Sequence, residues 1–315
     1  NVAEHAQAQI VSGSATGAAA GDKVTVTLGS QTYTTVLDAA GNWSVGVPAN
    51  VISALQDGTV TVSVSVTDAA GNTGSGTHNV TVDTGLPSVG FSTLSGDNVL
   101  NAVEKGQDLS VSGTSANLAE GTLVTVTLNG KQYTATTAAD GGWSLTVPAA
   151  DLAALGEANY TLSATATNTV GNSVSNTVNL QVDTALPTVT INTVAGDNVI
   201  NAAEVAAGQT IGGKVMNAEA GNTVTVTMGG NSWTATVQDD LTWSVNVPSE
   251  VLTALGNGGL SVTATVTNGH GNTGSGERDI TIDASLPGLR VDTVAGDDVI
   301  NSIEHGQNLI VSGSS

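Results

Sequence analysis

The sequence repeats itself every 100 residues, and the repeats align without a gap. Positions that recur at this interval include a tryptophan, a proline and an aspartate in each of three repeats: Trp43, Trp143, Trp243, Pro48, Pro148, Pro248, Asp83, Asp183 and Asp283. Solenoid proteins have shorter periods, of about 20–50 residues, whereas about 100 residues is enough for a complete domain. We therefore expect each repeat to bury its own hydrophobic core.

The boundaries of the repeats follow from one recurring segment. It has the sequence DTGLPSVGFSTLSGDNVLNAVE at 83–104 and returns in closely similar form at 183–204 and 283–304. Boundaries placed after the initial aspartates give complete repeats at 84–183 and 184–283, a repeat at 1–83 that lacks its first-strand segment, and the start of a further repeat at 284–315. The chain opens on NVAE, the tail of the same segment, so we expect it to be a fragment of a longer protein.

The pattern within a repeat indicates β-strands. Val124, Val126 and Leu128 alternate with threonines, and the Asn-Gly pair that follows is a strong hairpin signal. Further strands are predicted at 89–94, 109–113, 132–137, 143–147, 160–167 and 174–182, with a short helix at 148–156. About seven strands per repeat predict an all-β chain of tandem immunoglobulin-like sandwiches, arranged as beads on a string. There is no cysteine, so the sandwiches have no disulfide.

The chain is strongly acidic, with 27 acidic and 6 basic residues and a net charge of -21. Such a surface repels nucleic acid and anionic lipid, so we expect neither as a partner. The sequence also has no apolar run long enough to insert into a membrane. The charge favours either a protein that binds cations or a surface that is acidic only for solubility.

Three groups of oxygen-bearing side chains recur with the period. The first is the aspartate that ends each last strand: Asp83, Asp183 and Asp283. The second is a loop and the residues after it: Asp97, Asn98, Asn101 and Glu104; Asp197, Asn198, Asn201 and Glu204; Asp297, Asp298, Asn301 and Glu304. The third is the turn between the last two strands, at Asp68–Asn72, Asn168–Asn172 and Asn268–Asn272.

These groups suit calcium, which takes six to eight oxygen ligands from carboxylates, amides and carbonyls. Asp, Asn and Gly are also ordinary turn formers, and that alternative stays open. In favour of calcium, we find no turn function for a glutamate seven residues after an aspartate, and like charges at a joint repel one another. We expect each last-strand aspartate to share a joint with the next repeat's early loop. Strand polarity places the third group at the end of the sandwich where the last strand begins, which faces the preceding joint. This suggests two clusters, and the sequence leaves open which groups share an ion.

Other candidate sites have ordinary structural interpretations. Trp143 alternates in phase with Leu145 and Val147, which favours a core position over sugar stacking. The aspartates before the tryptophan strand, Asp38, Asp140, Asp239 and Asp240, are typical of hairpin turns. The histidines do not recur through the repeats, so a catalytic triad or zinc site is not supported, and we expect no enzymatic activity.

Four stretches carry a family resemblance: VTDAAGN at 66–72, VDT at 82–84, AGDNVINAAE at 195–204 and WSLTVPAADLAAL at 143–155. They resemble the tandem bacterial immunoglobulin-like repeats of giant non-fimbrial, SiiE-like adhesins, which are exported by type I secretion. The resemblance implies an extracellular position at the bacterial surface and calcium at or near the joints between adjacent repeats. It also implies that the host or surface ligand binds elsewhere in the parent protein. The weaker charge of Asn168 and Asn268, where the first repeat has Asp68, departs from this pattern.

We therefore expect an extender segment, a rod of sandwiches made rigid by calcium. The alternative is a set of ligand-binding repeats, each gripping a glycan or a host protein. An accessory module of a secreted enzyme is a third option.

Overall fold

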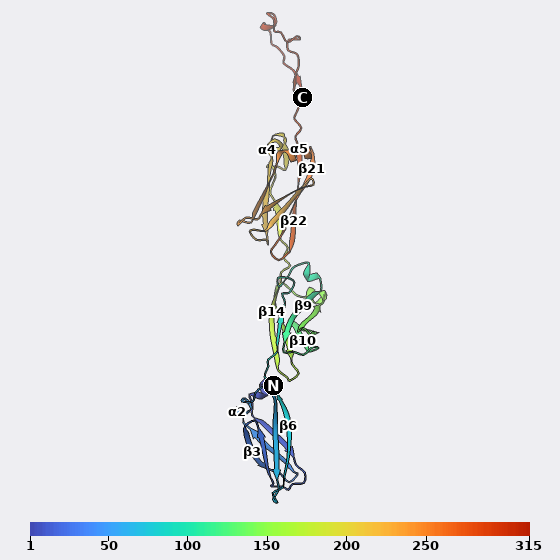
Figure 1. The fold of residues 1–315 in the computed structure, drawn as a ribbon. Coiled ribbons are helices and arrows are strands. Elements are labelled where there is room, and N and C mark those ends of the chain that lie inside the picture. Colours follow the sequence, from blue (N-terminus) through green and yellow to red (C-terminus); the bar gives the residue numbers. More distant parts are fainter. The chain divides into compact units, whose positions relative to one another are not determined.

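The computed structural model describes residues 1–315, which form two compact units, Asn1–Asp183 and Thr184–Ser315. Nearly all regular structure is β-strand, and buried side chains form three separate hydrophobic clusters, one in the second unit and two in the first. The expected all-β chain of tandem sandwiches is therefore confirmed (Figure 1). The division into repeats at 83, 183 and 283 stays a prediction.

The repeat at 84–183 is a complete sandwich. Its strands are β7 (Ser88–Phe91), β8 (Val99–Leu100), β9 (Leu109–Ala116), β10 (Leu123–Leu128), β11 (Lys131–Thr136), β12 (Gly142–Val147), β13 (Ala158–Thr167) and β14 (Ser173–Val182). One sheet has the order β11-β10-β13-β14-β8 and the other the order β12-β9-β7. The short helices are α3 (Ala149–Ala153), which follows Pro148 as predicted, and the 3-10 turn η1 (Glu104–Gly106).

The predicted first strand at 89–94 is shorter in the structure, where β7 ends at Phe91, and a second short strand, β8, follows in the other sheet. β7 pairs antiparallel with β9, and β8 then pairs parallel with the end of β14. Between them, Ser95 and Asn98 adopt positive φ angles of 52° and 66°, which turn the chain from one sheet to the other. Leu94, within this connection, is buried in the core. The first strand ends before Leu94, and the chain turns at Ser95–Asn98 to reach β8 in the other sheet.

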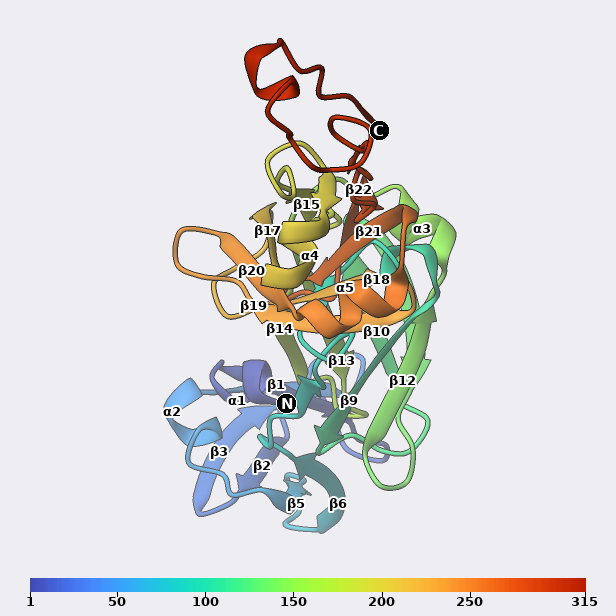
Figure 2. The same cartoon turned by 90° about the horizontal axis from the view of Figure 1, so that it is seen from above.

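The repeat at 184–283 has the same topology in the second unit. Its strands are β15 (Thr188–Ile191), β16 (Val199–Asn201), β17 (Gln209–Met216), β18 (Thr223–Met228), β19 (Asn231–Thr236), β20 (Thr242–Val247), β21 (Gly258–Thr267) and β22 (Thr273–Asp283). Its helices α4 (Ala202–Ala207) and α5 (Ser249–Leu255) pack side by side, as Figure 2 shows.

The first repeat has fewer strands. They are β1 (Gln9–Ser14), β2 (Lys23–Leu28), β3 (Gln31–Val36), β4 (Asn42–Val47), β5 (Gly58–Thr67) and β6 (Thr73–Val82), with helices α1 (Val2–His5) and α2 (Ala49–Ile52). β1 pairs only with β4, and the second sheet has the order β3-β2-β5-β6. No strand of this repeat corresponds to β7 or β8.

The buried core positions follow the alternation of apolar and polar residues along the strands. Val124 and Val126 are fully buried between the sheets, and so are their counterparts in the other repeats. The Trp143 ring is buried and meets Phe91 edge-on, with ring centroids 5.5 Å apart. The core interpretation of this tryptophan is confirmed, and burial of such a ring contributes several kcal/mol, of order 3–5, by comparison with truncation to alanine.

The last residues, 284–315, contain two short paired strands, β23 (Arg290–Val291) and β24 (Gly313–Ser314), and the 3-10 turn η2 (Glu304–Gly306). Most of the large apolar side chains in this segment are exposed. No helix of the structure has the length and apolar character needed to cross a membrane.

Candidate functional site

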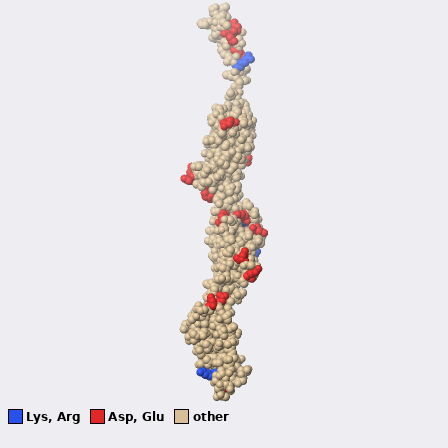
Figure 3. All heavy atoms as spheres, in the orientation of Figure 1, with Lys and Arg blue, Asp and Glu red and all other residues tan.

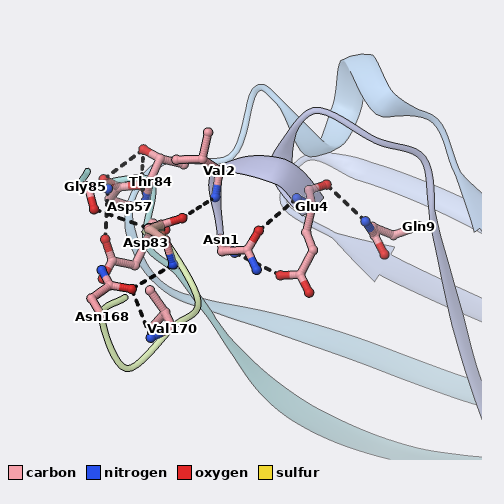
Figure 4. A network of polar contacts seen from close by, with 11 residues as sticks. Asn1, Val2, Glu4, Gln9, Asp57, Asp83, Thr84, Gly85, Asn168 and Val170 are labelled. Carbon is pink, nitrogen blue, oxygen red and sulfur yellow. Dashed lines mark hydrogen bonds and ion pairs between the residues drawn. The ribbon is translucent and has the colours of Figure 1, made fainter. Parts of the chain in front are cut away.

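The first unit contains a contact region between its two repeats, which we call the first joint. It consists of Asn1 and Glu4 at α1, Asp57 before β5, the link Asp83–Gly85 after β6, and the turn Asn168–Asn172 between β13 and β14 (Figure 4). β6 ends at Val82 and β14 begins at Ser173, so strand direction delivers the link and the turn to one place.

Asn172 connects the two repeats. Its side-chain nitrogen donates to the backbone oxygens of Asp83 (3.0 Å) and Gly85 (3.2 Å). Its side-chain oxygen accepts from the Val2 backbone nitrogen at 2.8 Å. The side chain is buried, with the residue only 3% exposed. These three bonds need both a donor and an acceptor, which an amide offers and a carboxylate does not.

The turn that presents Asn172 is held by Asn168. The Asn168 side-chain oxygen accepts from the backbone nitrogens of Val170 (3.2 Å) and Asn172 (2.8 Å). In the first repeat, Asp68 holds the equivalent turn in the same way, and Asn72 donates to the Asp68 carboxylate instead of reaching another segment. These hydrogen bonds, above all that from the Asn72 side chain, lower the pKa of Asp68.

Three carboxylates lie at the first joint, and each accepts hydrogen bonds from its own repeat or the link. Asp57 accepts from the Thr84 backbone nitrogen and hydroxyl, both at 2.9 Å. Asp83 accepts from the Gly85 nitrogen at 2.9 Å, and Glu4 accepts from the Asn1 nitrogen at 2.9 Å. The link between the repeats is thus bordered by acidic side chains.

The expected pairing of Asp83 with the loop at Asp97 is wrong. The Gln181 nitrogen donates to the Asn98 carbonyl, and the Asp183 nitrogen donates to the Leu100 carbonyl, so this loop lies at the far end of β14. Asp83 lies at the start of β14, ten residues away along the strand. The physical reason is that β8 runs parallel to β14 and carries the loop to the exit end of its own repeat.

The second unit shows the same relation, because β16 pairs in parallel with the end of β22 and places Asn201 opposite Asp283. Each loop therefore lies with the last-strand aspartate of its own repeat. At the first joint, the corresponding partners of Asp83 are Asn1 and Glu4, since these align with Asn101 and Glu104.

The inference that the recurring glutamate has no turn function is also wrong. Glu104 accepts from the Asn101 backbone nitrogen at 3.1 Å, while the Asn101 side chain accepts from the Glu104 nitrogen at 3.0 Å. The same reciprocal pair joins Asn201 with Glu204 and Asn301 with Glu304. At Asn201–Glu204 these bonds form the capping box of α4, and the same bond pair occurs at the 3-10 turns that begin at Glu104 and Glu304. The signature, Asn-x-x-Glu, is visible in the sequence. The spacing of the glutamate is therefore no argument for a metal.

The loop before it is held by local bonds as well. Asp97, Asp197 and Asp297 each accept from the backbone nitrogen two residues later, at 2.9 Å. Asn98 and Asn198 adopt positive φ and accept from the backbone nitrogen four residues earlier. The turn aspartates Asp38, Asp140 and Asp240 likewise accept from nearby backbone amides, which confirms their hairpin role.

The donor set at the first joint consists of oxygens: three carboxylates, the three amide side chains of Asn1, Asn168 and Asn172, and the carbonyls of Asp83 and Gly85. This chemistry fits a hard divalent cation such as calcium. In this structure no three histidine, cysteine, aspartate or glutamate side chains lie close enough together to hold a metal ion. Acidic side chains outnumber basic ones over the whole chain, and Figure 3 shows several of them on one face.

A family model described as a bacterial Ig-like domain matches residues 6–84 and 93–184, more than half of the chain. The chain belongs to this family. The two matched segments correspond to the first two repeats, each with its own core cluster. No functionally curated protein matches the chain.

Solved structures with similar sequences include bacterial adhesins. One, described as a calcium-stabilised adhesin that helps an Antarctic bacterium bind ice, is 34% identical over all of this chain and 79% of its own, with a TM-score of 0.48. A 1.5-MDa bacterial ice-binding adhesin is 30% identical over 90% of this chain and 94% of its own, with a TM-score of 0.48. An immunoglobulin-like domain of the M. primoryensis ice-binding adhesin is 36% identical over 31% of this chain and 97% of its own, with a TM-score of 0.25.

One acidic position at the joint escaped the sequence analysis. Asp57 aligns with Glu157 and Asn257, so an oxygen-bearing side chain recurs here with the period. Asn257 makes the equivalent hydrogen bond. Its side-chain oxygen accepts from the Ala284 nitrogen at 3.0 Å, as the Asp57 carboxylate accepts from the Thr84 nitrogen. The period itself was the signal, but the residue type changes from repeat to repeat.

Proposed function

We propose that this chain is an extender segment of a bacterial surface adhesin, in which repeated sandwiches carry a binding site away from the cell. Three observations support the proposal: each repeat has its own core, the chain belongs to the bacterial Ig-like family, and its similar structures belong to adhesins. The strongest support for the proposal is the buried Asn172 side chain, because its hydrogen bonds connect one repeat to the next. A link of this kind suits a segment whose task is to span distance.

The proposal includes an extracellular position, type I export as in SiiE-like adhesins, and a host or surface ligand bound elsewhere in the parent protein. Bacterial Ig-like repeats of adhesins are structural domains, and we assign no catalytic role to this chain. The recurring tryptophans, Trp43, Trp143 and Trp243, are buried in the cores and are not placed to stack on a sugar. The extender is therefore preferred to the ligand-binding repeat.

We further propose that calcium binds at the joints and stiffens them, and the name of the calcium-stabilised adhesin supports this. At the first joint the ion would be held by Asp83, Asp57 and Glu4, with amide and carbonyl oxygens beside them. A divalent cation there would offset the repulsion among the carboxylates and restrict the link between repeats. In the later repeats the proposed ligands come from the sets named above: Asp183 with Asp97, Asn98, Asn101 and Glu104; Asp283 with Asp197, Asn198, Asn201 and Glu204; and also Asp297, Asp298, Asn301 and Glu304. In the first repeat, the turn residues Asp68 and Asn72 are a further candidate pair.

The test is thermal unfolding of the full chain with calcium and with chelator. Extracellular sites bind calcium with a Kd of about 0.1–1 mM, so a several-fold excess adds about 1 kcal/mol per site. Asp83→Asn should reduce the calcium-dependent shift, whereas Asp38→Asn, in a hairpin turn, should leave it unchanged. Small-angle scattering should show a longer, stiffer particle with calcium. Superimposable curves with calcium and chelator would refute the calcium proposal.

A further inference from the structure

Asparagine followed by glycine occurs at three places in the chain. The pairs are Asn129-Gly130, Asn257-Gly258 and Asn268-Gly269. In such a pair the backbone nitrogen of the glycine can attack the side-chain carbonyl carbon of the asparagine, and glycine hinders the attack least because it has no Cβ. The attack needs an asparagine side chain that is free to turn and a glycine nitrogen that is free to react. The structure separates the three pairs on these two requirements.

The Asn129-Gly130 pair meets both requirements. It forms the tip of the hairpin between β10 and β11, with φ angles of 48° and 78°. Both residues are exposed, and neither the Asn129 side chain nor the Gly130 nitrogen makes a hydrogen bond. A Cβ built on Gly130 would meet no atom within 4 Å, so the space around the attacking nitrogen is open. The tip of a hairpin also opens locally at low cost in free energy, which lets the side chain and the nitrogen meet.

Asn257 is exposed as well, but both atoms of its amide are engaged. Its side-chain oxygen accepts from the Ala284 nitrogen at 3.0 Å, and its side-chain nitrogen donates to the Ser285 hydroxyl at 2.8 Å. Gly258 is the first residue of β21 and lies opposite Ile282 of β22. Turning the Asn257 side chain towards the Gly258 nitrogen would break both hydrogen bonds, and we expect this pair to react slowly.

The third pair is protected at both reacting groups. Asn268 is only 8% exposed. Its side-chain oxygen accepts from the Asn272 nitrogen at 2.9 Å, and its side-chain nitrogen donates to the Asn217 carbonyl at 3.4 Å. The Gly269 nitrogen, which would have to attack, donates to the Glu219 carboxylate at 3.2 Å. The attacking atom and its target are therefore both held by other groups.

We propose that Asn129 is a site of spontaneous modification, which loses its side-chain amide through a cyclic imide with Gly130. The Gly130 nitrogen forms a bond to the Asn129 side-chain carbonyl carbon, the bond from that carbon to the amide nitrogen breaks, and the Gly130 proton leaves with that nitrogen as ammonia. Water then opens the imide. Attack of water on the side-chain carbonyl leaves aspartate, whereas attack on the main-chain carbonyl leaves isoaspartate, whose backbone runs through the side chain. Water is the only co-reactant, and nothing is oxidised or reduced.

The two products differ in their effect on the hairpin. Aspartate fits the turn, because Asp-Gly is also a preferred pair in two-residue hairpins. Isoaspartate lengthens the backbone at the tip and should disturb the pairing of Leu128 with Lys131. The equivalent turns of the other repeats, Gly29-Ser30 and Gly229-Gly230, have no asparagine and do not react in this way. The modification is thus specific to one repeat, and it does not depend on the proposed extender function.

The test follows the three asparagines in the full chain during incubation in mildly alkaline buffer. Peptide mapping by mass spectrometry measures loss of each amide, with fragmentation that distinguishes aspartate from isoaspartate. In the folded chain, Asn129 should lose its amide at least about tenfold faster than Asn257 or Asn268. In urea the three pairs are equally free, so their rates should become similar, with Asn257 and Asn268 at least about tenfold faster than in the folded chain.

Two variants serve as controls. Asn129→Gly gives the hairpin the Gly-Gly tip of the third repeat and should remove the fast phase of ammonia release. Asn129→Asp is identical to one product and should unfold at the same denaturant concentration as the wild type, whereas the isoaspartate form, separated by chromatography, should unfold at a lower one. A folded chain in which Asn129 keeps its amide as long as Asn257 and Asn268 would overturn the proposal. A fast phase of ammonia release that persists in Asn129→Gly would overturn it too.

Discussion

The side chain of Asn172 donates a hydrogen bond to the backbone oxygen of Asp83, 3.0 Å away and 89 residues earlier in the chain. The bond joins the turn before the last strand of one repeat to the link that follows the repeat before it. The same amide also binds Gly85 and Val2, so a single buried side chain serves three backbone groups. This arrangement depends on an amide, because an ionised aspartate at position 172 would offer no donor to the two carbonyls.

Asn172→Ala should destabilise the joint. The substitution leaves the Val2 amide without its acceptor and two carbonyls without their donor, for a loss of about 1–3 kcal/mol in the free energy of unfolding. Hydrogen exchange at the Val2 amide should become faster. Asn72→Ala, at the equivalent exposed position, is the control and should change stability by about 0.5 kcal/mol or less. Equal effects of the two substitutions would contradict the role of Asn172.

Glu104→Gln separates the capping role from a metal role. Glutamine also closes a capping box, so in chelator the variant should unfold with the wild type, within about 0.5 kcal/mol. Asn101→Ala removes the cap and should cost about 0.5–2 kcal/mol under the same conditions. If Glu104 also binds calcium, the calcium-dependent rise in Tm should be smaller in Glu104→Gln. A loss of stability in chelator would show that the charge itself matters to the fold.

Gly276→Val should disrupt the third repeat. The added Cβ overlaps the Val189 carbonyl oxygen, which forces β15 away from β22 at a cost of about 1–3 kcal/mol or more. Gly76→Val meets no such atom and should not lower the unfolding temperature of the first repeat. Hydrogen exchange measured along a chemical denaturation series would show which repeat has lost stability in each variant. Equal losses of stability in Gly276→Val and Gly76→Val would contradict this prediction.

Tyr133 and Asp151 should titrate as a linked pair. Burial, followed by the 2.9 Å hydrogen bond to Asp151, raises the pKa of Tyr133 from 10.0 to about 12. The stability from this shift is complete below pH 10 and is lost as the pH rises towards about 12. Asp151→Asn should lower the pKa of Tyr133, as measured by ultraviolet absorbance.

The Asp151 carboxylate should show the opposite dependence. Its bonds to Lys131, at 2.6 Å and 2.7 Å, and to Tyr133 hold its pKa below the ordinary value of 3.8. The stability that it contributes is therefore present above about pH 4 and is lost as the pH falls through the lowered pKa. At low pH the free energy of unfolding of Asp151→Asn should equal that of the wild type. Near neutrality it should be lower than that of the wild type.

Local features were the most predictable part of the fold. The hairpin at Asn129-Gly130 forms between β10 and β11, with Leu128 paired to Lys131, because the turn and its flanking alternation are contained in a few residues. Trp143 and the short helix after Pro148 were predicted for the same reason. The length of the first strand was not, because the turn at Ser95 depends on the second sheet that receives β8.

The candidate site was predicted as a list of residue types and not as a set of neighbours. The period identified Asp83, Glu104 and the turn at Asn168, yet Asp83 and Glu104 belong to opposite ends of one repeat. The function of the glutamate in a capping box was readable from Asn-x-x-Glu and was overlooked. The joining role of Asn172 was not readable, since its partners are distant in the chain and are backbone atoms.

The amino-acid sequence alone determined that this protein is a series of acidic β-domains with a period of 100 residues, because periodicity, strand alternation and turn chemistry are local properties of the chain. Only the tertiary structure decided which acidic loops lie together and which side chain joins two repeats. The physical reason is that β8 crosses to the other sheet and runs parallel to the last strand, and this pairing of distant segments sets the end of the sandwich at which each side chain lies.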